Sequence, residues 1–205
     1  MRKLVIVFCA LFVFLVSGYS QSSRFGVSLT PQYSFFNKKV KPETGNEYSI
    51  KGNGLLFNGG IYYENRFKPK AAFSLGVGYT HLKTSNTASD TTIGNSTTKL
   101  GFLSIPIGIS YEYPIREDKF IVGLIGKFSF EYLLSENSGG VKIDVANYKA
   151  ADRLNFMGSV GINFMCFFTE NFGASLVPTF SILFTKKEEP TYLGLGGSLR
   201  LFYVF

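Results

Sequence analysis

The feature that most constrains this chain is a two-residue alternation of apolar and small polar side chains, which recurs in eight segments. In the first segment, Phe25, Val27 and Leu29 alternate with Gly26 and Ser28. Successive side chains of a β-strand point to opposite faces, so the alternation predicts a strand with one apolar and one polar face. The other seven segments cover about residues 55–64, 73–80, 103–113, 122–132, 156–164, 175–184 and 193–205. The chain is therefore predicted to be all-β.

Composition indicates which way the apolar faces point. Charged residues make up 17% of the 205 residues, below the roughly 25% of an ordinary soluble domain. A lipid bilayer offers no water to the backbone, so a sheet crosses it only when it closes into a barrel. We therefore predict an eight-stranded antiparallel up-and-down transmembrane β-barrel of the outer-membrane type. A soluble barrel or sandwich, with the apolar faces turned inward, is the alternative.

The connectors between the segments alternate in length, which predicts the orientation of the barrel. Long polar connectors cover about residues 37–53, 83–98, 135–153 and 185–191, and short ones cover about 65–70, 114–119 and 169–172. Long loops at one end and tight turns at the other are typical of outer-membrane barrels. An even number of strands brings both termini to the end with the short turns. The predicted location is the cell outer membrane, with both termini in the periplasm.

The first twenty residues predict a cleaved secretory signal peptide. Arg2 and Lys3 precede an unbroken apolar run over residues 4–16, and small residues follow at 17–20. The run is shorter than the ~20 residues that a membrane-spanning helix needs. Residues 1–20 are therefore assigned to the signal peptide and residues 21–205 to the barrel. Cys166 is then the single cysteine of the mature chain, so no internal disulfide is expected.

Five charged residues fall on the polar, inward face of the predicted strands: Glu64, Glu112, Lys127, Glu131 and Arg200. Charges in a confined lumen are stable when they are paired. The hypothesis is an ion-pair plug in which Arg200 and Lys127 face Glu64 and Glu112; the alternative is that some of these residues lie at strand ends in water. Eight strands enclose a space just wide enough for side chains, so a general diffusion pore is not expected.

The positions of the aromatic residues and prolines predict two further features, aromatic girdles and β-bulges. Tyrosines near strand ends, Tyr132 and Tyr192 among them, are typical of the aromatic girdles at membrane interfaces. Pro31, Pro106 and Pro178 fall inside predicted strands, where each removes one hydrogen-bond donor from the ladder. We expect these prolines to mark β-bulges.

The composition argues against catalytic and metal sites. His81 is the single histidine and the chain has two cysteines, so a Cys/His zinc site lacks its ligands and no metal or cofactor is expected. A pairing of His81 with a serine such as Ser85 lacks a nucleophile motif, and a solvated histidine beside a loop is favoured. The chain is not expected to be an enzyme, with an outer-membrane lipid-modifying enzyme as the least favoured alternative.

Charge patterning bears on the partners of the chain. The formal net charge is +7, but the basic residues are scattered and the chain is exported, so nucleic-acid binding is not expected. Basic residues in the predicted loops, such as Lys39 and Lys51, are suited to anionic lipid headgroups. Outer-membrane lipid and lipopolysaccharide are therefore the expected surroundings of the barrel.

The end of the chain and one strand resemble known outer-membrane proteins. The residues Leu199, Leu201, Tyr203 and Phe205 end the chain on an aromatic residue, a pattern that resembles the C-terminal signal read by the outer-membrane assembly machinery. The segment FLSIPIGISYEY, residues 102–113, resembles a strand of the outer membrane protein β-barrel domain family, which includes the PorT-like proteins of Bacteroidota. This resemblance implies an eight-stranded barrel, in some members linked to secretion, and transfers no catalytic residue.

Three functions follow in order of preference. The first is a small integral barrel with a side-chain-filled lumen and a structural or interaction role through its extracellular loops. The second, implied by the resemblance alone, is a PorT-like accessory of a secretion system with a protein partner in the secretion complex. The third is the lipid-modifying enzyme.

Overall fold

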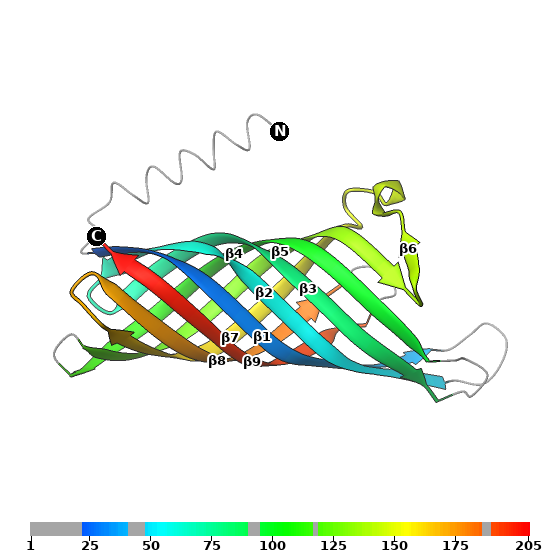
Figure 1. The fold of residues 1–205 in the computed structure, drawn as a ribbon, viewed down its shortest axis with the longest axis horizontal. Coiled ribbons are helices and arrows are strands. Elements are labelled where there is room, and N and C mark those ends of the chain that lie inside the picture. The colour runs from blue at the N-terminus through cyan, green and yellow to red at the C-terminus, as the bar shows by residue number, and fades with distance from the viewer. Residues whose placement is uncertain (1–21, 41–47, 90–94, 117–118, 186–189) are drawn as a thin grey trace.

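The computed structural model describes residues 22–40, 48–89, 95–116, 119–185 and 190–205, so the predicted signal peptide lies outside the described residues. Within them the chain forms nine strands and one short 3-10 helix, η1 (Val145–Asn147) (Figure 1). The strands are β1 (Ser22–Val40), β2 (Tyr48–Lys68), β3 (Ala71–Ala88), β4 (Ser96–Arg116), β5 (Phe120–Ser138), β6 (Val141–Ile143), β7 (Leu154–Phe167), β8 (Phe172–Phe184) and β9 (Tyr192–Val204).

Eight of these strands close into a barrel. Their order is β4-β3-β2-β1-β9-β8-β7-β5, the ring closes through the β4–β5 pairing, and β6 adds three residues beside β5. Following paired residues once around the ring from Phe25 returns to β1 at Phe35, a stagger of ten residues. Such a stagger tilts the strands by roughly 35–45° from the barrel axis. The predicted all-β, antiparallel up-and-down barrel is confirmed.

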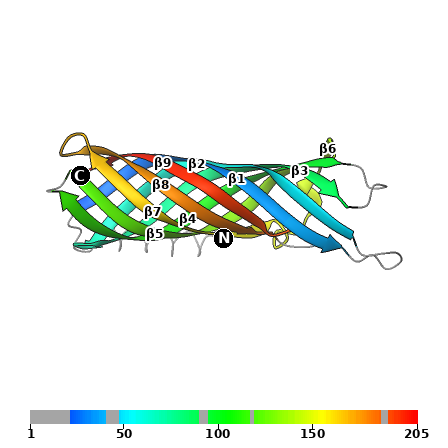
Figure 2. The same cartoon turned by 90° about the horizontal axis from the view of Figure 1, so that it is seen from below.

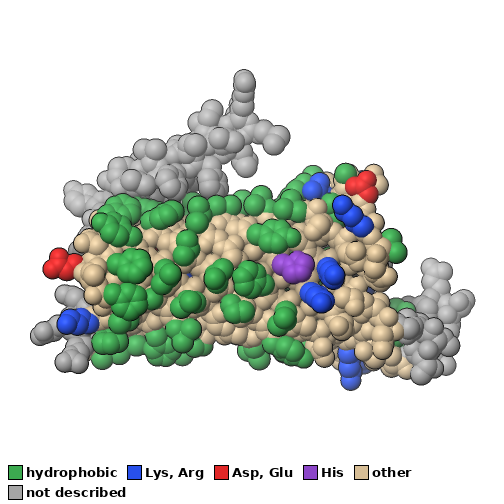
Figure 3. All heavy atoms as spheres, viewed as in Figure 1, with side chains coloured by type: hydrophobic (Ala, Val, Ile, Leu, Met, Phe, Trp, Pro, Cys, Tyr) green, Lys and Arg blue, Asp and Glu red, His purple; other side chains and the backbone are tan. Residues whose placement is uncertain are grey.

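The apolar face of each strand points outward. Val27, Leu124 and Val160 are 46%, 64% and 60% exposed, whereas inward serines and threonines such as Ser104 and Thr80 are fully buried. Apolar side chains form a broad green band on the barrel wall in Figure 3. A soluble barrel would bury these side chains, so the orientation excludes the soluble alternative.

Strands β1 to β5 are longer than the sequence pattern predicted. They contain 18 to 21 residues each, whereas a tilted strand spans the hydrocarbon core with about 9–11. Much of the connectors predicted at 37–53 and 83–98 is therefore strand, because a hairpin that leaves the membrane keeps its ladder hydrogen bonds. Strands β7 to β9 have 13 or 14 residues. The wall formed by β1 to β5 consequently extends further at the loop end (Figures 1 and 2).

The short turns and both ends of the described barrel lie together. β1 begins and β9 ends at the same end as the β2–β3 and β7–β8 turns (Figure 1). The last residue is held to the first strand, since the Ser23 N–H donates to the Phe205 carbonyl at 3.1 Å and the Phe205 N–H donates to the Ser23 carbonyl at 3.0 Å. We call this the turn end and the opposite one the loop end. Within the described residues, no helix has the length and apolarity needed to span a membrane.

The expectation that the three prolines mark β-bulges is wrong. The pairing register continues unchanged past Pro31, Pro106 and Pro178, and the register shifts lie between Arg66 and Lys68, Gly101 and Phe102, and Pro114 and Arg116. A proline removes one donor, and the ladder tolerates this local gap without an inserted residue.

Tyr192 differs from the expected aromatic girdle. It lies on the inward face of β9 and is 2% exposed, with its ring edge-on to Phe36 at a centroid distance of 5.0 Å. Tyr203 on the same strand is 52% exposed. The alternation of faces along β9 separates the two tyrosines, because side chains share a face only when their positions differ by an even number, and Tyr192 and Tyr203 differ by an odd one.

Candidate functional site

Side chains fill the interior of the barrel in layers. An apolar group, the loop-side plug, occupies the loop end: Phe36, Leu56, Leu82, Leu100, Phe102, Leu133, Val145, Met157, Leu183 and Tyr192. A smaller apolar group lies toward the turn end: Tyr62, Ile121, Met165 and Phe202. Val145 belongs to η1, so the segment after β6 folds back onto the loop-side plug. Charged and hydroxyl side chains occupy the remaining interior.

Arg24 connects two carboxylates across the turn end of the lumen. Its Nη1 donates to Glu64 Oε1 at 2.7 Å and to Glu112 Oε1 at 2.5 Å, and its Nη2 donates to Glu112 Oε2 at 3.0 Å. These side chains come from β1, β2 and β4 and are almost completely buried. The second and third bonds form a bidentate pair, the geometry in which arginine binds a carboxylate most strongly.

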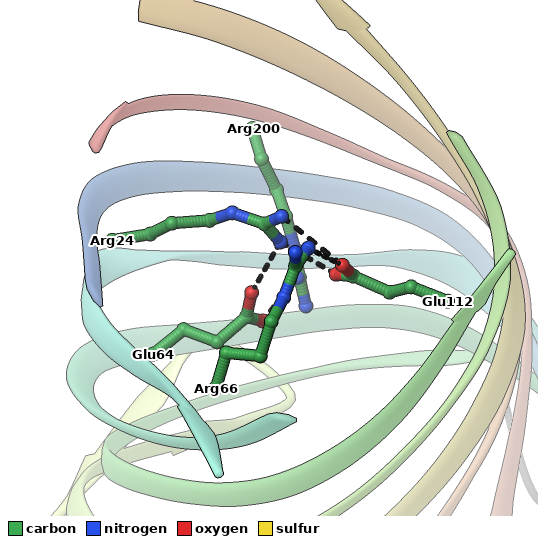
Figure 4. A network of polar contacts seen from close by, with 5 residues as sticks. All are labelled: Arg24, Glu64, Arg66, Glu112 and Arg200. Carbon is green, nitrogen blue, oxygen red and sulfur yellow. Dashed lines mark hydrogen bonds and ion pairs between the residues drawn. The ribbon is translucent and has the colours of Figure 1, made fainter. Parts of the chain in front are cut away.

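Two further arginines complete this group. Arg66 of β2 donates through Nη2 to Glu112 Oε2, and Nη1 of Arg200 on β9 lies 4.0 Å from Glu64 Oε2. Figure 4 shows the five side chains converging from the barrel wall toward its centre. We call Arg24, Glu64, Arg66, Glu112 and Arg200 the lumen network.

Aromatic rings enclose the arginines of the lumen network. The Arg24 guanidinium carbon lies 5.4 Å from the ring centroid of Phe202, and that of Arg200 lies 5.0 Å from the ring centroid of Tyr62. A cation over an aromatic face is attracted by the ring quadrupole, most strongly where water is excluded. The lumen network and these rings together close the turn end of the interior.

The structure places the five predicted lumen residues in two groups. Glu64, Glu112 and Arg200 meet in the lumen network, whereas Lys127 and Glu131 do not belong to it. Within the described part of the chain, neither Lys127 nor Glu131 forms an ion pair. The expected pairing of Lys127 with Glu64 or Glu112 is therefore not the arrangement found, and Arg24 occupies the position between those carboxylates.

Lys127 and Arg200 instead line a small cavity at mid-lumen. It has a volume of about 50 Å³, and its other lining groups include Asn58 and the hydroxyls of Thr30 and Ser198. A space of this size and polarity suits a few water molecules. Thr30 Oγ1 donates to Ser198 Oγ at 2.9 Å across the β1–β9 seam. The cavity lies between the lumen network and the loop-side plug.

Glu131 lies too far along β5 to reach the arginines. Its carboxylate accepts a hydrogen bond from Ser104 Oγ at 2.7 Å, and its Oε2 has no hydrogen-bond partner among the described residues. Nearby on the same inner wall, Asn58 Nδ2 donates to Thr80 Oγ1 at 2.7 Å. Glu131 follows Lys127 by four residues toward the loop end, whereas the arginines of the lumen network enter from the turn end.

Sequence reasoning missed Arg24 and Arg66. Arg24 directly precedes the first predicted strand, and Arg66 falls in the connector predicted at 65–70. Both have even numbers, like the inward residues Gly26 and Glu64 beside them. Extending the alternation by one or two residues at each strand end would have placed both arginines in the lumen.

The four residues of the predicted assembly signal point outward, three of them on β9 and Phe205 directly after it. Leu199, Leu201, Tyr203 and Phe205 are all exposed to the surroundings of the barrel, by 41% to 64%. The ring of Phe205 lies 6.4 Å from that of Tyr63 on β2, on the far side of β1. The last residue therefore contributes to the seam that joins the first and last strands.

His81 lies on the outer wall of β3. Its ring stacks on Tyr79 at a centroid distance of 6.5 Å with an interplanar angle of 16°. Ser85 lies further along the same outward face. Within the described ranges, no group of three or more His, Cys, Asp or Glu side chains is arranged to hold a metal ion.

Comparison with known proteins identifies a family and a fold. Residues 6–197 match the family described as "Outer membrane protein beta-barrel domain". The outer membrane protein OprG from Pseudomonas aeruginosa superimposes with a TM-score of 0.54 and 11% identity, covering 92% of this chain and 98% of that chain. The Escherichia coli outer membrane protease OmpT gives a TM-score of 0.48 and 13% identity, over 92% of this chain and 98% of that one. No curated protein matches the sequence.

Proposed function

The chain belongs to the outer membrane protein beta-barrel domain family, and from this premise we propose that it is a small integral outer-membrane barrel with a closed lumen and an interaction role at its loop end. The turn end, where the first described strand begins and the last one ends, faces the periplasm in this proposal, and the loop end faces outward. Tight periplasmic turns and longer external loops are the usual arrangement of such barrels.

The filled interior is the observation that carries this proposal. The lumen network closes the turn end, the loop-side plug closes the loop end, and a cavity of about 50 Å³ lies between them. Porins that conduct solutes have 16–18 strands around a water-filled channel. With the lumen closed to solutes, the extension of β1 to β5 at the loop end is the surface available for an interaction.

The closed lumen predicts the electrical behaviour of the purified protein. We expect a planar lipid bilayer that contains the inserted barrel to show no large, stable conductance steps, because no continuous water path crosses the interior. Insertion is verified in parallel by the shift in gel mobility that a folded barrel shows before and after heating. Reproducible steps of porin size from the unheated protein would overturn the closed lumen.

A PorT-like accessory role in secretion is the second candidate. It rests on the resemblance of residues 102–113 and on the family membership. The experiment that separates the two candidates is deletion of the gene, followed by profiling of surface-exposed and secreted proteins. If the protein is an interaction barrel, the deletion strain is expected to secrete the same proteins as the wild type. Loss of secreted proteins in the deletion strain, and their return when the wild-type gene is restored, would favour the accessory role.

A further inference from the structure

Two lysines lie directly opposite each other on the outer wall of the barrel. Lys83 on β3 pairs with Lys99 on β4, and both side chains are exposed. Like charges directly across a pair of antiparallel strands repel each other and destabilise the sheet. An anion between the two ammonium groups would remove this cost.

The protein supplies no such anion among the residues that the structure describes. Across the neighbouring strands, Lys83 faces Leu55 of β2 and Lys99 faces Asn137 of β5. Every ion pair of the described residues lies in the lumen network, on the other side of the wall. An anion that balanced this pair would therefore have to come from outside the described residues.

The height of the pair on the wall indicates the source of the anion. On β3, the outward face changes from Val77 through Tyr79 and His81 to Lys83 in the direction of the loop end. An aromatic residue followed by a cation marks the level at which hydrocarbon gives way to lipid headgroups. In Figure 3 the purple histidine lies at the border of the green apolar band, with blue side chains beyond it toward the loop end.

We propose that Lys83 and Lys99 form a binding site for the phosphate groups of an anionic glycolipid in the leaflet at the loop end. The lipid tails lie along the apolar wall below the site, and a headgroup phosphate lies between the two ammonium groups. Exposed Lys51, further along the outward face of β2, is placed to meet a second phosphate. This inference rests on the proposed function, since it requires the loop end to face a lipid leaflet.

The test measures lipid bound by the purified full-length barrel. Diphosphoryl lipid A, its monophosphoryl form and phosphatidylglycerol are added separately to the detergent-solubilised protein, and bound lipid is counted by native mass spectrometry. Wild type is expected to prefer the diphosphoryl form. Lys83→Gln together with Lys99→Gln is expected to weaken this binding by about 30-fold, roughly fivefold for each lysine near an anionic headgroup.

The control variant carries the same change of charge at the other end of the barrel. Lys68 and Lys70 are exposed at the turn end, and Lys68→Gln with Lys70→Gln is expected to bind diphosphoryl lipid A like wild type. Equal loss in both double variants, or no loss in either, would overturn the site. Displacement of the lipid by millimolar soluble pyrophosphate would identify a free phosphate site instead. A negative result in the lipid-binding test does not affect the conductance measurement, so the lipid site and the closed lumen are tested separately.

Discussion

Replacing Arg24 by methionine is expected to lower the free energy of unfolding by about 3–5 kcal/mol, the usual cost of removing one partner from a buried ion pair. Arg24 holds Glu64 and Glu112 together through three short hydrogen bonds. Without it, Glu112 keeps Arg66, but the nearest cation to Glu64 is Arg200 at 4.0 Å. Denaturant titration of the barrel in lipid vesicles measures the change.

Two control variants isolate the buried charge as the cause. Adding Glu64→Gln to Arg24→Met is expected to recover part of the lost stability, because a neutral amide costs less to bury alone than a carboxylate. Replacing the exposed Lys68 by methionine is expected to change stability by no more than about 0.5 kcal/mol. If Arg24→Met behaved like Lys68→Met, the lumen network would not contribute to stability.

An arginine in place of Val160 is expected to cost about 2–4 kcal/mol of membrane stability. Val160 is the seventh of the fourteen residues of β7 and is 60% exposed on the outer wall. A cation at this position meets the middle of the hydrocarbon, where its charge has no counter-ion or water. The free energy of unfolding from vesicles and the inserted fraction both report the loss.

Ser85 offers the matched comparison for this change. It is exposed on the same outward face, but it lies beyond Lys83 on the extension of β3. Ser85→Arg is expected to cost about 0–1 kcal/mol, the value for a cation near the interface. Equal losses in Val160→Arg and Ser85→Arg would contradict the position of the apolar band, and with it the membrane orientation of the barrel.

The two predictions concern opposite faces of the same wall. The outward face is stable because it meets lipid, and an added charge is harmful there. The inward face carries charges that are stable because they meet each other, and removal of a charge is harmful there. The lumen network therefore helps to close the interior, in agreement with the proposed function. On the outward face, the proposed role of Lys83 and Lys99 is to bind lipid headgroups.

Local sequence order was sufficient to assign the two faces within the eight predicted segments, although not for Arg24, Arg66 and Tyr192 just outside them. The direction of a side chain alternates with every residue in a strand, so local order alone was sufficient to place Val160 outside and Glu64, Glu112 and Arg200 inside. The number of barrel strands followed from counting the alternating segments. These features depend on neighbours in the chain and need no knowledge of the closed barrel.

Which inward charges meet, and how far the strands extend, depends on the assembled barrel. Arg24 reaches Glu112 from 88 residues away because closure with a ten-residue stagger sets the height of each strand against all the others. Lys127 and Glu131 share the inward face, yet they lie closer to the loop end than the lumen network does. The local sequence pattern gives the face of a residue but not its height in the barrel. The extension of β1 to β5 likewise depends on ladder hydrogen bonds between strands, which form only after the sheet has assembled.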